Sequence, residues 1–219
     1  MNRHAETALV VGAPLALALL ELYHPHPHDL FRLDLRAWLT VHYLQIVLFP
    51  LAALALARIV RDRRGFAAGL CRAGAFVFGV SWIAFDTAAG VTTGILLESA
   101  RASGAPEAWR GAIMSIWEHP IVGAGASPGS APLLAVTGTF AWPVGCLAAA
   151  LALRRAGTSW IPTVLLVISG VSFLAFRTHA SPGGPLAFGA LAAAAASLRW
   201  ASPRLDAARQ VLPSSARLS

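Results

Sequence analysis

The chain has 219 residues, of which 57% are hydrophobic and only 12% are charged, and its mean hydropathy is +0.64. A soluble domain of this length carries about 25% charged residues, so the composition excludes an ordinary soluble domain and indicates a polytopic membrane protein. All 17 basic residues are arginine, and they give a net charge of +7. They lie in short clusters beside apolar runs, with no basic stripe interleaved with aromatic residues, so we expect no nucleic-acid partner.

The first apolar run, over residues 7–22, follows a charged N-terminus with Arg3 and resembles a signal peptide. No small-residue cleavage site follows it, only the sequence Glu-Leu-Tyr-His-Pro. Cleavage needs small residues just beyond the apolar region. We therefore expect this run to be retained as a first membrane helix.

Six stretches are long and apolar enough to cross a bilayer, since a spanning helix needs roughly 20 such residues. The third is longer than the hydrocarbon layer is thick and is predicted to tilt or to project beyond the lipid. The predicted fold class is an all-α polytopic membrane protein, with one six-helix domain over residues 1–201 and a polar cytoplasmic tail over 202–219. The predicted spans are residues 7–23, 42–60, 66–97, 131–153, 160–178 and 185–200.

The arginines predict the orientation. With six spans and the N-terminus in the cytoplasm, twelve of the 17 arginines fall on the cytoplasmic side. Loops rich in arginine stay in the cytoplasm. The prediction is a protein of the cell membrane that crosses the lipid bilayer several times and has both termini in the cytoplasm.

Two short helices are predicted outside the lipid on the opposite, extracytoplasmic side. Asp29 is expected to cap a helix whose apolar face runs through Trp38 and His42 into the second span. Pro106 suits the first turn of another helix, which ends at Trp117. Its tryptophans form an apolar stripe of the kind that lies at a membrane interface.

The sequence ELYHPHPHDL, residues 21–30, is the main functional signal. His24 and His26 each precede a proline, which favours extended backbone, and residues two apart in an extended segment point to the same side. With His28 they form a stiff run of imidazoles, which suits zinc, copper, iron or nickel. Asp29 or Glu21 could complete the shell. The alternative is that the run only ends a membrane helix.

Three further histidines are predicted at the same side of the membrane. His42 starts the second span with Gln45 one turn away, His119 lies between Glu118 and Pro120, and His179 closes the fifth span. Each alone is more typical of a helix end than of a metal ligand. Together with the histidine run they make a candidate metal set of His24, His26, His28, His42, His119 and His179.

Asp86 is the candidate catalytic residue. It lies well inside the third span, where a charged group costs about 2.5–3.5 kcal/mol and normally faces the interior of a helix bundle. Gly90 and Gly94 follow at one and two turns and permit close approach of a neighbouring helix. Asp86 would serve as a proton relay, an ion site or a metal ligand. The alternative is a structural hydrogen bond to another helix.

Three functions remain open. The first is a site on the extracytoplasmic side that binds a transition metal (zinc, copper or iron), for chemistry at the membrane edge or for metal handling. The second is a b-type cytochrome, with haem between histidines such as His42 and His179. The third is an accessory subunit that assembles with other membrane subunits, with the histidines as interface or pH-responsive groups.

Overall fold

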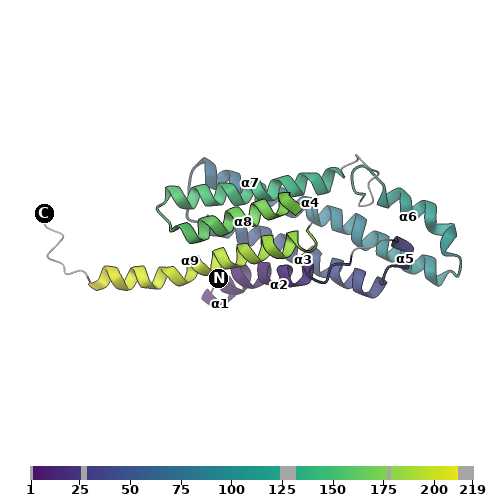
Figure 1. Ribbon diagram of the computed structural model, residues 1–219, viewed down its shortest axis with the longest axis horizontal. Coiled ribbons are helices and arrows are strands. Elements are labelled where there is room, and N and C mark those ends of the chain that lie inside the picture. Colours follow the sequence, from purple (N-terminus) through teal and green to yellow (C-terminus); the bar gives the residue numbers. More distant parts are fainter. Residues whose placement is uncertain (1, 26–28, 124–131, 177–178, 212–219) are drawn as a thin grey trace.

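A computed structural model describes residues 2–25, 29–123, 132–176 and 179–211, and the side chains only as far as residue 200. The described chain is helical and contains no strand (Figure 1). The all-α prediction is thereby confirmed. Four helical stretches are long and apolar enough to cross a membrane: Arg3–Glu21, Leu35–Ile59, Phe66–Ala102 and Leu133–Arg155. A shorter apolar helix covers Trp160–Phe176.

The chain begins with one continuous helical stretch. It consists of α1 (Arg3–Thr7), a π-helical turn η1 (Ala8–Gly12) and α2 (Ala13–Glu21). After a turn, Asp29 caps a 3-10 helix η2 (Leu30–Arg32), whereas α3 (Leu35–Ile59) is capped by Asp34. Both carboxylates accept backbone N–H groups that the first turn leaves unpaired. The predicted helix from Asp29 through Trp38 and His42 is therefore wrong at its start: Asp29 caps only η2, and the helix that carries Trp38 and His42 begins after Asp34.

The long third stretch comprises α4 (Phe66–Phe85), a π-helical turn η3 (Asp86–Thr92) and α5 (Thr93–Ala102). It is followed by η4 (Pro106–Trp109) and α6 (Arg110–Trp117), so the segment predicted over 106–117 is helical. At one end of the molecule α5 and α6 extend beyond the main body (Figure 1). The chain continues through α7 (Leu133–Arg155), α8 (Trp160–Phe176) and α9 (Gly183–Val211).

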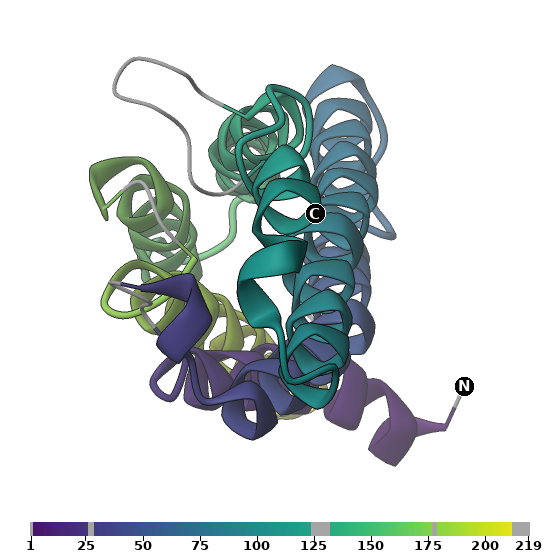
Figure 2. The ribbon, with the colours of Figure 1, turned by 90° about the vertical axis from the view of Figure 1, so that its right-hand side faces the viewer.

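Six helices form a closed ring. In the order α2, α3, α4, α7, α8 and α9, each packs against the next, and α9 packs back against α2. The view along the long axis shows them around a common centre (Figure 2). Short turns at Gly65 and Gly157, both at positive φ, reverse the chain between neighbours, a backbone conformation that glycine adopts without steric cost.

Large apolar side chains from every helix of the ring fill its centre. Phe78 lies with its ring centroid 4.4 Å from that of Trp142, and Phe49 lies 5.9 Å from Phe188. Such tilted and edge-on contacts are favourable aromatic geometries. The result is a closely packed aromatic plug. Its fully buried members are Leu17, Phe49, Phe78, Trp142, Phe173 and Phe188.

A second, smaller apolar core lies under the projecting part. Leu30 and Leu33 from the η2 segment meet Trp38 of α3, Leu97 of α5 and Ile113 of α6. Arg101 of α5 donates to the carbonyls of Phe31 and Leu33 at 3.0 and 2.6 Å, which fastens the same segment. The histidine-containing turn at residues 22–25 therefore lies between two fixed elements, the end of α2 and η2.

Candidate metal site

A cluster of buried polar side chains lies at one end of the aromatic plug. The ring of His179, from the turn that precedes α9, lies 4.6 Å from Trp82 and 5.7 Å from Phe49, measured between centroids. Glu21, the last residue of α2, is fully buried beside it. His24 lies in the turn after α2, and its ring centroid is 4.6 Å from that of His179. Three segments that are distant in sequence thus meet at one point.

Glu21, His24 and His179 are placed to share a metal ion. Each offers one ligand atom, and these three atoms all lie within 4.8 Å of one another. The carboxylate Oε2 of Glu21 and Nδ1 of His179 are 3.1 Å apart, which is hydrogen-bonding distance. Two ligands on a tetrahedral ion with bonds of about 2.0–2.1 Å are separated by roughly 3.3 Å. Two imidazoles and a carboxylate are a donor set that proteins use for metal ions, so the group could hold a metal ion.

Backbone carbonyls fix the tautomers of two histidines. Nδ1 of His24 is 2.9 Å from the carbonyl of Pro25, and Nδ1 of His42 is 2.8 Å from the carbonyl of Trp38. A carbonyl only accepts, so in both rings Nδ1 carries the proton and Nε2 bears the lone pair. This is the arrangement that metal-binding histidines use. Burial and the neighbouring His179 lower the pKa of His24 to about 3, so its imidazole is neutral at neutral pH.

Gln45 of α3 orients the acid of this cluster. Its Nε2 donates to Oε1 of Glu21 at 2.8 Å and lies 3.3 Å from Nδ1 of His179. Gln45 itself is fully buried. The amide of Gln45 thereby holds one carboxylate oxygen of Glu21, and the other carboxylate oxygen faces His179. Residues that hydrogen-bond to metal ligands orient them in this way.

We expect Gln45→Leu to weaken metal binding by about 10–100-fold, the usual cost of removing an outer partner of a metal ligand. Leucine keeps the bulk of the side chain but removes the amide that donates to Oε1 of Glu21. The measurement is the metal dissociation constant, determined by competition with a chelator, together with the melting temperature. Unchanged affinity in a variant that melts like the wild type would show that Gln45 has only a packing role.

Two glycines allow α3 to approach the third helical stretch closely beside the cluster. A Cβ added at Gly90 would lie 1.9 Å from Cδ2 of His42, and one at Gly94 would lie 2.5 Å from a methyl group of Leu39. The carbonyl of Gly90 also accepts a hydrogen bond from Nε1 of Trp38 at 2.7 Å. The close approach predicted from Gly90 and Gly94 is confirmed, and the side chain that it accommodates is His42.

His42 lies next to Glu21, His24 and His179 but is not one of these three converging ligands. Its ring centroid is 5.2 Å from that of His24, and it is buried between Trp38 and Gly90. With Nε2 as its lone-pair nitrogen, His42 is positioned as a neighbour of the site rather than as one of its three closest ligands.

Asp86 begins η3 and is fully buried. Neither of its carboxylate oxygens has a hydrogen-bond partner within the part of the chain that the structure describes. Gly90 of η3 lies against His42, and Gly79 of α4 lies against Ala53. The third helical stretch and α3 are therefore antiparallel, and with this register Asp86 lies at the height of Gln45. The Glu21 carboxylate is within electrostatic reach of it. A π-helical turn of this kind is frequent at functional sites.

The remaining predicted ligands lie elsewhere or outside the description. His119 is in the exposed turn that follows α6, where its Nδ1 accepts a hydrogen bond from the backbone of Ile121 at 3.2 Å. It is not among the ligands that converge. His26 and His28 lie outside the described residues. Asp29 faces Arg32 at the surface, so it takes no part in the buried cluster.

No family model matches the chain, and the comparisons with curated proteins and with solved structures found no match.

Proposed function

We propose that this is a six-span membrane protein whose polar cluster opens toward the extracytoplasmic side. Four helical stretches have the length and apolarity for a crossing, and α8 and α9 complete the same ring. Large apolar side chains remain exposed around its outside, such as Phe76, Phe140 and Ile161, as suits a surface that faces lipid. The arginine-rich turns then lie in the cytoplasm with both termini, and the cluster lies at the opposite end.

The proposed function is binding of a divalent transition metal by Glu21, His24 and His179 for chemistry at the membrane edge. The observation that carries it is the convergence of three ligand atoms within 4.8 Å from three separate segments. Among the described residues three protein ligands converge, the number that catalytic zinc sites use with one coordination position left open. A metal held there would supply Lewis acidity and lower the pKa of a bound water, which suits hydrolysis of a lipid-like substrate.

The interior of the ring favours this role over metal transport. On the side of the ring interior, His179 packs against Trp82 and Phe49, and the rest of the aromatic plug follows. A metal path through the ring would have to pass side chains that are fully buried against one another. Chemistry at the end of the bundle needs no such path.

The arrangement also favours a small ion over haem. His24 packs edge-on against both His42 and His179, with centroids 5.2 and 4.6 Å away. A porphyrin between His42 and His179 would have to displace that ring. Haem would give a strong visible absorption band, so a spectrum of the purified protein separates these two proposals.

The experiment is metal analysis of protein purified in mild detergent without a histidine tag, together with its absorption spectrum. We expect about one zinc, copper or iron ion per chain, retained through gel filtration, and no haem band. A sample free of metal, which stays free of it after incubation with each ion, would contradict the proposal. Stoichiometric co-purification of a second membrane protein would instead favour an accessory subunit.

We assign Asp86 the role of a proton relay beside the site, not that of a metal ligand. The prediction is that Asp86→Leu retains the metal and unfolds at a higher temperature than the wild type. A buried polar group without a partner costs about 1–3 kcal/mol, which leucine of similar size removes. Melting temperature and metal content of Asp86→Leu and Asp86→Asn test this. Loss of the metal would make Asp86 a ligand, and a lower melting temperature would reveal a structural partner.

A further inference from the structure

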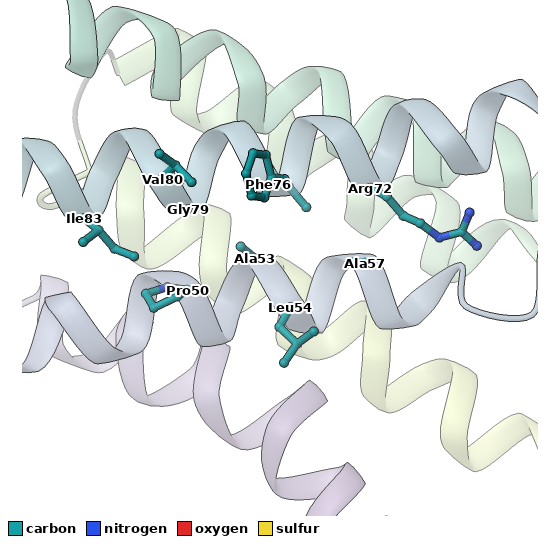
Figure 3. A pocket seen from close by; sticks show the side chains of 10 residues that line it. Pro50, Ala53, Leu54, Ala57, Arg72, Phe76, Gly79, Val80 and Ile83 are labelled. Atoms are coloured by element: carbon teal, nitrogen blue, oxygen red, sulfur yellow. The ribbon is translucent and has the colours of Figure 1, made fainter.

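An apolar groove runs along the outside of the ring between α3 and α4 (Figure 3). It has a volume of about 270 Å³. Its floor is made of small buried residues, among them Ala53, Ala75 and Gly79. Its rim carries Leu54, Phe76 and Val80, which are 46%, 70% and 52% exposed. The groove is therefore a hollow in the surface that the proposed membrane placement turns toward lipid.

The dimensions of the groove match one leaflet of a bilayer. Along α4 it extends from Arg72 to Ile83, which is about 16 Å at 1.5 Å per residue. The hydrocarbon core of a bilayer is about 30 Å thick, so one leaflet contributes roughly half of that. An extended acyl chain that enters from one membrane surface would lie along the groove and end near Ile83.

One end of the groove is positively charged. Nη2 of Arg72 donates to the carbonyls of Val60 and Arg63 at 2.9 and 2.8 Å, which holds the guanidinium at the end of the groove beside the turn between α3 and α4. This turn carries further arginines at 61, 63 and 64, against a single acid, Asp62. Nε and Nη1 of Arg72 are not engaged by these bonds. A phosphate at the membrane surface would meet a cation there.

We propose that the groove between α3 and α4 binds one acyl chain of an anionic phospholipid, whose phosphate lies against Arg72. The assignment to the cytoplasmic leaflet rests on the proposed orientation, whereas the groove itself is independent of the metal site. A zwitterionic lipid would fill the apolar part without using the charged end.

The charged end is tested by native mass spectrometry of delipidated protein titrated with phosphatidylglycerol or phosphatidylcholine of identical chains. We expect the wild type to retain phosphatidylglycerol more strongly. Arg72→Gln should lower that retention about 5-fold, the equivalent of roughly 1 kcal/mol per arginine at a membrane surface, and Arg72→Lys should preserve it. The control is Arg32→Gln, because Arg32 is an exposed arginine at the other end of the molecule, with 88% of its side chain accessible.

The apolar part of the groove is tested by a substitution that fills it with a larger side chain. A Cβ at Gly79 would lie 3.4 Å from that of Ala53 and 3.9 Å from Cα of Pro50, so the Gly79→Leu side chain starts at the floor of the groove between the two helices. We expect it to reduce binding of both lipids. Gly69→Leu makes the same change on α4 where nothing lies within 4 Å, and it should bind like the wild type. Equal retention of the two lipids by the wild type, or equal binding by both leucine variants, would overturn the proposal.

Discussion

Replacing His179 by alanine is expected to lower the metal affinity by more than about 100-fold, because loss of a direct ligand costs more than loss of the outer partner that orients one. The same loss is expected for His24→Ala, which changes a residue in the turn after α2 and leaves the aromatic plug untouched. The measurement is metal content after gel filtration, followed by titration of the metal-free protein with zinc or iron.

His119→Ala is the matched control for these two variants. It removes an imidazole from the same end of the molecule, but from an exposed turn apart from the cluster. We expect it to keep its metal. If His24→Ala and His119→Ala lose equal amounts of metal while both remain folded, the ion is bound by exposed imidazoles in general, and the buried cluster is not the site.

Periodicity and composition were sufficient to predict the all-helical class and the long apolar helices, because burial in lipid and in a helix bundle demands long apolar runs. The sequence over 66–97 predicted a helix too long for the bilayer, and the structure continues it to Ala102 through η3. The position of Asp86 at the start of that π-helical turn was not predictable. A π-helical turn shifts the apolar face by about one residue, and that shift cannot be seen in a helix that is apolar on most of its sides.

Only part of the candidate site could be predicted, because its assembly depends on contacts between helices that are distant in sequence. The run HPHPH predicts His24 as a ligand, and the helix ends predict His42 and His179. The sequence indicates Glu21 only as one of two acids that could complete the shell, and Gln45 only as a neighbour of His42. Their roles depend on the pairing of α2 with α3 and α9, which is long-range. A buried Glu at the last position of an apolar helix, with a Gln on the next helix, is the signal that could have indicated them.

The turn before α9 provides the second prediction with a large effect. It contains a cis peptide bond between Ser181 and Pro182 and brings Gly184 against the backbone of His179. A Cβ at Gly184 would lie 1.6 Å from the carbonyl oxygen of His179 and 2.9 Å from Cγ of Glu21. Gly184→Ala must therefore displace the backbone that carries one ligand and press on the side chain of another.

We expect Gly184→Ala to destabilise the protein by about 1–3 kcal/mol, as overpacking does, and to lose most of its metal. Gly189→Ala is the matched control, since it makes the same change in α9 at a position where nothing lies within 4 Å. There alanine should stabilise the helix by about 0.5–1 kcal/mol. The two variants are compared by melting temperature with and without added metal. If added metal raises the melting temperature of Gly189→Ala but not that of Gly184→Ala, the contact between Gly184, His179 and Glu21 shapes the metal site. If both respond alike, the turn before α9 has no part in it.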